Sequence, residues 1–184
     1  MSILRGIVRV ARFRVEGLAE FDASRNGFFN SIAPWVAFPL VGSLLELGQG
    51  SAIDALTDLL ASVVALLVPL VISEILATRW NVGENWLGYA VAANWSQWIL
   101  PMAMAAMLAA FWVMRAFGIT TTQPMLVGAV VGMLIYGLAL HWFLARRALG
   151  LSRGRSFLLV SICDMATLAM VMGPRLVEMQ FNPG

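Results

Sequence analysis

The stretch WLGYAVAANWSQWILPMAMAAMLAAFWVM, residues 86–114, contains no charged residue. It exceeds the ~20 apolar residues that a helix needs to cross the ~30 Å hydrocarbon core of a bilayer. The chain of 184 residues is 60% hydrophobic and 12% charged, against about 45–50% and about 25% in soluble domains. Because a soluble domain of ~150 residues buries only about 70% of its unfolded surface, the sequence predicts an integral membrane protein.

Four further apolar runs lie on either side of this stretch. Together they predict an all-α, polytopic membrane protein in which residues 26–184 form a bundle of five transmembrane helices. The expected spans are residues 28–47, 54–77, 86–114, 122–145 and 156–173.

Prolines mark where these helices should bend or stop, because proline lacks the backbone N–H and its ring obstructs the preceding turn. Pro34 and Pro39 predict a kinked first span, and Pro69 lies in the second. Pro101 interrupts the third span, and Pro174 is expected to close the fifth.

Residues 1–25 read as a separate amphipathic segment. Apolar residues at helical spacing (Ile3, Leu4, Ile7, Val8, Ala11, Val15 and Leu18) lie opposite a charged face of Arg5, Arg9, Arg12, Glu16 and Glu20. An Arg-rich face opposite an aliphatic one is typical of a helix that lies in the membrane interface. We therefore expect an N-terminal interfacial helix that binds the membrane surface through Arg5, Arg9 and Arg12. A helix docked on the rest of the protein is the alternative.

Arginine positions predict the orientation, since cytoplasmic loops of membrane proteins carry an excess of basic residues. The chain has 12 basic residues, all Arg. If the N-terminus is cytoplasmic, only Arg115 and Arg175 lie outside, and the other ten lie inside: Arg5, Arg9, Arg12, Arg14, Arg25, Arg79, Arg146, Arg147, Arg153 and Arg155. This split predicts a cytoplasmic N-terminus and an external C-terminus. The Lys-free, Arg- and Ala-rich composition suggests a bacterial source, hence the cytoplasmic (inner) membrane.

Asp164 lies near the middle of the fifth span, where a carboxylate costs about 2.5–3.5 kcal/mol. At 1.5 Å per residue it is roughly 12 Å deep, the depth expected for Asn94 in the third span. Similar counting gives an intramembrane polar cluster in the cytoplasmic half of the bilayer: Glu74, Asn94, Ser96, Gln97, His141 and Asp164.

Two interpretations of this cluster stay open. It could line a water-filled vestibule that opens to the cytoplasm and is closed on the other side by residues 102–110. Alternatively, Asp164 could hydrogen-bond to Asn94 or Gln97 and only fix the register of the helices.

Small residues indicate where helices could approach closely. Gly88 and Ala92 are four residues apart in the third span, and Gly128 and Gly132 form a GxxxG pattern in the fourth. We expect these residues to mediate helix packing within the bundle, with a dimer interface as the alternative.

Most catalytic and cofactor chemistry lacks the residues it needs. One His and one Cys provide neither a zinc nor a haem constellation, and no phosphate-binding, dinucleotide-binding or hydrolase motif occurs. The basic residues lie between apolar runs and form no nucleic-acid patch. We therefore expect no cofactor, no metal and no nucleic-acid partner.

Three passages carry a family resemblance: GLAEFDASRNGFFNSIAPWVAFPL at 17–40, AVAANWSQWILP at 90–101 and LALHWFLARRALGLSRGRSF at 138–157. In these passages the chain resembles uncharacterised bacterial five-span membrane proteins similar to the Yip family. The resemblance implies a five-helix bundle with a cytoplasmic N-terminus, and it transfers no functional residue.

The first functional hypothesis is a non-enzymatic scaffold or accessory subunit of a membrane assembly. Its candidate partners are the lipid bilayer, other membrane subunits and a second copy of the chain. The alternative is a small transporter or channel protomer that uses the Asn94, Gln97 and Asp164 cluster for a proton, a cation or a small polar solute. A lipid-modifying enzyme would have only Asp164, His141 and Glu74 as acid–base groups.

Overall fold

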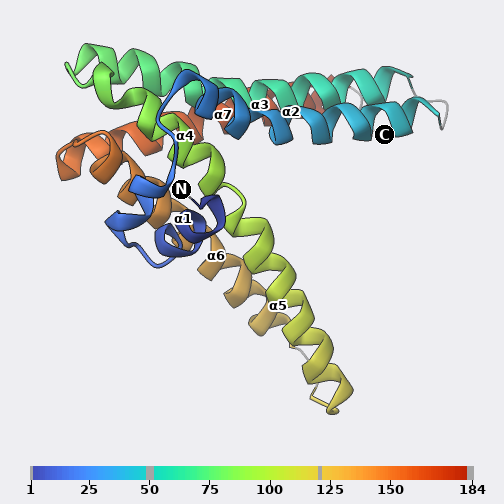
Figure 1. The fold of residues 1–184 in the computed structure, drawn as a ribbon. Helices are drawn as coiled ribbons and strands as arrows, with labels where there is room; N and C mark the ends of the chain where they lie inside the picture. Colours follow the sequence, from blue (N-terminus) through green and yellow to red (C-terminus); the bar gives the residue numbers. More distant parts are fainter. Residues whose placement is uncertain (1, 49–51, 120–121, 182–184) are drawn as a thin grey trace.

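The computed structural model describes residues 2–48, 52–119 and 122–181, with the backbone alone for residues 54 and 174–181. The described chain is all-α (Figure 1). Its elements are α1 (Ile3–Val10), the 3-10 helix η1 (Val15–Glu20), α2 (Arg25–Leu47), α3 (Ala52–Arg79), the 3-10 helix η2 (Gly83–Asn85), α4 (Trp86–Ser96), α5 (Ile99–Ala116), α6 (Gln123–Ala148) and α7 (Arg153–Phe181).

Five helical segments are long and apolar enough to cross a membrane, which confirms the five expected spans. These segments are Arg25–Leu47, Ala55–Arg79, Gly83–Ala116, Gln123–Ala148 and Arg153–Gly173. The prediction of a five-span, all-α membrane protein with a short N-terminal helix is therefore confirmed.

The third span is divided at Gln97 and Trp98, between α4 and α5. Pro101 accounts for this position, because a proline ring clashes with the carbonyl of the residue four positions earlier, here Gln97. Pro101 itself lies in the first turn of α5, where its missing N–H breaks no helical bond. The predicted interruption is confirmed, and the break precedes the proline by one turn.

The prediction that Pro174 closes the fifth span is wrong, since α7 continues to Phe181. Membrane helices tolerate proline where local adjustment and neighbouring groups satisfy the freed backbone. The same tolerance is visible at Pro34 and Pro39 inside α2 and at Pro69 inside α3.

The N-terminal segment is amphipathic but is not one continuous helix, so that part of the prediction is wrong. Helix α1 ends at Val10, and Phe13 has a positive φ of 55° at the turn that leads to η1. The turn folds η1 back along α1, and Glu20 accepts a 2.8 Å hydrogen bond from Arg9. Because the segment reverses direction, its Arg9 and Glu20 side chains can pair with each other.

This segment docks on the transmembrane helices, as the alternative expected. Tyr136 of α6 donates a 2.7 Å hydrogen bond to the carbonyl of Ala11, and the Phe13 ring makes edge contacts with Tyr136 and Phe143. Ile7 and Val10 are buried, whereas Leu4 is 70% exposed. The segment thus has one docked apolar side and one exposed apolar side.

The transmembrane helices form two arms that diverge from a common base (Figure 1). Helices α2, α3 and α7 form one arm, and α5 with the first part of α6 forms the other. The base, where α1, α4, the end of α6 and the start of α7 meet, has fully buried Leu140, Leu144 and Leu159 at its core. Helix α5 comes close to the backbone of the other described helices at very few positions.

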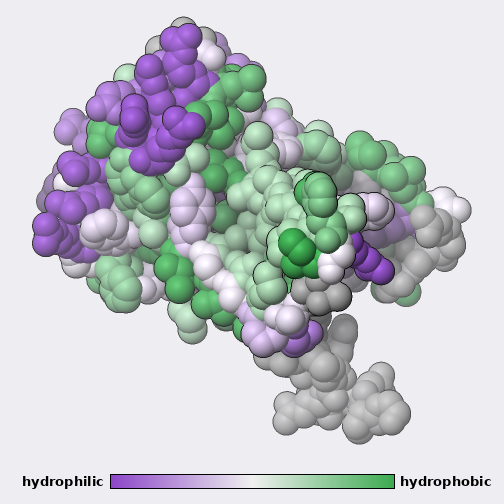
Figure 2. Space-filling view, turned by 90° about the horizontal axis from the view of Figure 1, so that it is seen from below, coloured by the Kyte–Doolittle hydropathy of each residue, from purple (hydrophilic) through white to green (hydrophobic). Residues whose placement is uncertain are grey.

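Hydrophilic residues gather at one end of the molecule (Figure 2). The N-terminal segment and the α3–α4 and α6–α7 connections lie at this end (Figure 1). Here Trp80, after α3, stacks beneath the Arg155 guanidinium at 5.9 Å from the ring centre. The connections that were predicted to share one side of the membrane are therefore neighbours.

Gly27 lies in the first turn of α2, and because it has no side chain the backbone of Asp22 can lie against it. A Cβ there would lie only 1.9 Å from the carbonyl oxygen of Asp22. We predict that Gly27→Ala lowers the free energy of unfolding by about 1–3 kcal/mol, because overpacking forces the backbone to shift. The thermal unfolding midpoint in detergent should fall accordingly. The matched control is Gly42→Ala on the same helix, where a Cβ meets nothing within 4 Å. Equal midpoints for the two variants would contradict this packing.

Candidate functional site

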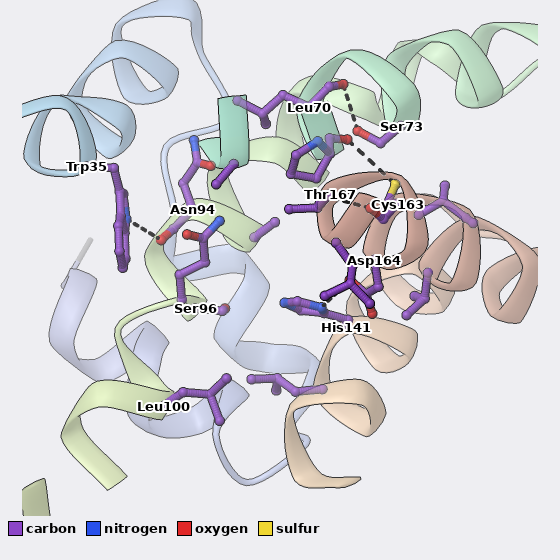
Figure 3. Close-up of a pocket in the computed structure, with 18 of the residues that line it drawn as sticks. Trp35, Leu70, Ser73, Asn94, Ser96, Leu100, His141, Cys163, Asp164 and Thr167 are labelled. Atoms are coloured by element: carbon purple, nitrogen blue, oxygen red, sulfur yellow. Dashed lines mark hydrogen bonds and ion pairs between the residues drawn. The ribbon is translucent and has the colours of Figure 1, made fainter. Parts of the chain in front are cut away.

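A cavity of about 570 Å³ lies where the five spans converge (Figure 3). This volume is within the range of about 300–1,000 Å³ typical of small-molecule sites. Each span contributes to its wall, including Trp35 from α2, Pro69 from α3, Asn94 from α4, His141 from α6 and Asp164 from α7.

Asn94 is held rigidly on one wall of this cavity by α2. In a continuous helix its carbonyl would accept from the N–H of Trp98, but the break before α5 turns that N–H to Trp95. The freed Asn94 carbonyl instead accepts a 3.1 Å hydrogen bond from the Trp35 indole. The break thus creates the contact that fastens Asn94 to α2.

The neighbouring Ser31 fixes the side-chain orientation of Asn94. The Ser31 hydroxyl donates its only proton to the carbonyl of Phe28 at 2.7 Å, so its oxygen can only accept from the Asn94 amide, at 3.0 Å. The atom of Asn94 that faces Ser31 is therefore Nδ2. Its Oδ1, the acceptor end, remains without a hydrogen-bond partner among the described residues although Asn94 is fully buried.

Ser96 adds a second unpartnered polar atom to the same wall. It is 2% exposed, and its Oγ makes no hydrogen bond within the described chain. Leaving a buried polar atom unpaired costs about 1–3 kcal/mol. Both residues line the cavity, although each unpartnered atom itself has almost no exposed surface.

The opposite wall carries the ionisable pair of the cavity (Figure 3). His141 Nδ1 and Asp164 Oδ1 are 3.7 Å apart, close enough for an ion pair when the imidazole is protonated but longer than a hydrogen bond. Their side chains remain 40% and 39% exposed, so neither is enclosed by the other. Both retain hydrogen-bonding capacity that faces open space.

The structure brings most of the predicted polar cluster together. Asn94, Ser96, Gln97, His141 and Asp164 all line this cavity, as the depth counting predicted. Glu74 does not; it is exposed on α3, while the adjacent Ser73 lines the cavity. Asp164 makes no hydrogen bond with Asn94 or Gln97 within the described chain, so that interpretation of its role gains no support.

The small residues predicted for helix packing fall into two groups. Ala92 is buried in the core, and a Cβ on Gly88 would reach ordinary contact distance, 3.5 Å, from Ala23. A Cβ on Gly128 or Gly132 would meet nothing within 4 Å in the described chain. The GxxxG pattern therefore faces outward and brings no other described helix into close contact.

The three arginines predicted for the membrane surface differ in availability. Arg9 is paired with Glu20, and Arg5 lies 3.9 Å from the same carboxylate with its side chain 64% exposed. Arg12 is exposed at the turn after α1.

Sequence reasoning missed the residues that anchor the site. Ser31 and Trp35 immobilise Asn94, and the Cys163 thiol contacts the carbonyl of Pro69 at 3.7 Å between α7 and α3. Ser31 is a polar residue in an apolar run, the same signal that identified Asn94. A serine hydroxyl can bond to its own helix, however, so it did not require a partner elsewhere.

The fold and the cavity define a multi-pass integral membrane protein with a polar site between its spans. No family model, no curated protein and no solved structure matches the chain. The resemblance to the Yip family therefore gains no support from these comparisons.

The Ser31–Asn94 contact yields a stability prediction. Ser31→Ala should lower the free energy of unfolding by about 1–3 kcal/mol, and with it the unfolding midpoint, because it leaves the buried Asn94 amide donor without a partner. Adding Asn94→Leu removes the stranded amide and should recover most of that loss. Thermal unfolding of the two single variants and the double variant gives the coupling between the sites. Strictly additive losses would contradict the hydrogen bond.

Proposed function

We propose that this chain is a non-enzymatic membrane protein whose cavity binds a small polar solute, as in a small transporter or channel protomer. The supporting observation is a cavity between the spans that is lined by the partly exposed side chains of His141 and Asp164, which lie 3.7 Å apart and form no hydrogen bond with each other. A site that only fixed the register of the helices would pair these groups with one another.

The chemistry of the walls favours a solute that donates hydrogen bonds. An ionised Asp164 only accepts hydrogen bonds. A proton or a small ammonium-type cation bound to it would offset the cost of a carboxylate inside the bilayer.

An accessory or scaffold role remains the second candidate, and a different observation favours it. The exposed GxxxG pattern of Gly128 and Gly132 on α6 is the type of surface on which membrane helices approach closely. Another membrane subunit or a second copy of this chain could occupy it.

We also propose that the N-terminus is cytoplasmic in a bacterial inner membrane. The arginine distribution supports this orientation. The adjacency of Trp80 and Arg155 supports a shared side for the α3–α4 and α6–α7 connections. The exposed Leu4 and Arg12 support contact of the N-terminal segment with the membrane surface.

Transport can be measured in proteoliposomes. We predict uptake of radiolabelled methylammonium by the intact protein and at least a tenfold decrease in Asp164→Asn, which loses the anionic acceptor. Glu74→Gln is the matched control, because it removes a carboxylate from α3 outside the cavity and should leave uptake unchanged. Uptake no faster than in empty liposomes, or equal in the wild type and Asp164→Asn, would refute the proposal.

Cysteine labelling tests the access side. In a Cys163→Ala background, we expect Gln97→Cys to react with a membrane-impermeant maleimide faster from the cytoplasmic face of inverted vesicles than Leu108→Cys, which lies on α5 outside the cavity. Equal labelling rates would exclude a vestibule that opens to the cytoplasm.

A further inference from the structure

A second, apolar cavity of about 460 Å³ adjoins the polar one. Its wall comes mainly from α5 and α6, including Met104, Met133 and Leu134. His141 and Asp164 line both cavities, as do Leu100 and Pro101. We call the cavity of about 570 Å³ the polar chamber and the cavity of about 460 Å³ the apolar groove. The pair of His141 and Asp164 therefore lies at the junction of the two.

The apolar groove opens toward the surroundings of the molecule. Met104 is 48% exposed, Leu134 is 64% exposed and Leu138 is 51% exposed. These residues belong to membrane-spanning segments, so the groove faces the hydrocarbon of the bilayer. A molecule could enter it sideways from the lipid without crossing the aqueous end of the protein.

The side chains of the polar chamber determine which polar headgroup a bound molecule would carry. The Asp164 carboxylate, whose side chain is 39% exposed, accepts hydrogen bonds when ionised and disfavours a purely anionic head. No Arg of the described chain lines either cavity, so neither cavity offers a guanidinium group that could donate two hydrogen bonds to a phosphate or a carboxylate. A trimethylated ammonium lacks the N–H groups with which a primary ammonium would hydrogen-bond to the Asp164 carboxylate.

We propose that the two cavities together bind an amphiphile with a primary ammonium head. The head lies against Asp164, where the two cavities meet, and the hydrocarbon chain lies in the groove between α5 and α6. This inference rests on the proposed polar site and names the class of its ligand. A free long-chain amine and the amine headgroup of a lipid share this chemistry.

The test uses dodecylamine with a diazirine at the end of its chain, added to the protein in phosphatidylcholine vesicles. After illumination, we expect crosslinks on the groove residues of α5 and α6, identified by mass spectrometry. A dodecyltrimethylammonium probe with the same diazirine should label these residues at least tenfold less. Equal labelling by the two probes would overturn the proposal.

Two variants separate the groove from the head site. Met133→Trp fills the groove without touching the polar chamber, and it should reduce crosslinking at least tenfold. Met125→Trp, on the same helix and lining neither cavity, is the matched control and should label as the wild type does. Asp164→Asn should also reduce crosslinking at least tenfold.

Each outcome is decisive. Unchanged crosslinking in Met133→Trp overturns the amphiphile inference, yet the proposed function stands if Asp164→Asn still loses methylammonium uptake. Unchanged crosslinking and uptake in Asp164→Asn overturn both. If Asp164→Asn does not fold, as judged by its gel-filtration profile, Met133→Trp decides alone.

Competition identifies the source of the amine. Displacement of the probe by phosphatidylethanolamine supports a lipid headgroup, and displacement by unlabelled dodecylamine alone supports a free long-chain amine. Displacement by neither overturns the proposal.

Discussion

Pro101 has no backbone N–H, its ring obstructs the carbonyl of Gln97, and the longest apolar run of this chain is divided at Gln97 and Trp98. The break releases the carbonyl of Asn94 to the Trp35 indole and thereby links the third span to α2. It also separates α5, which follows α6 away from the other three spans (Figure 1). The polar cavity and the apolar groove both lie beside this break, and Pro101 lines each of them.

A membrane interior tolerates polar side chains only when other groups satisfy them, and this chain satisfies them unevenly. Ser31 gives its proton to Phe28 and accepts from Asn94, so its hydrogen bonds are complete. Asn94 is satisfied at its nitrogen and left unsatisfied at its oxygen. The third span therefore keeps one buried acceptor that no described residue satisfies.

Position along the helices could be predicted from the sequence, because an α-helix rises a constant 1.5 Å per residue. Counting from the span ends correctly brought Asn94 and Asp164 to one cavity. The direction in which a side chain faces could not be obtained in this way. Glu74 has a suitable depth but lies about 100° around the helix from Ser73, and only Ser73 faces the cavity. The reversal after Val10 also escaped prediction, because it depends on the contacts of Phe13 with α6.

The position of Asp164 follows from these constraints taken together. A carboxylate that faced lipid would bear the full cost of its depth, and one sealed by a close partner would have no capacity left for a ligand. Asp164 has His141 at 3.7 Å, too far for a hydrogen bond. The divergence of the two arms keeps open space on both sides of this pair. The carboxylate therefore keeps hydrogen-bonding capacity on the side of each cavity, which is the property that the proposed cation site requires.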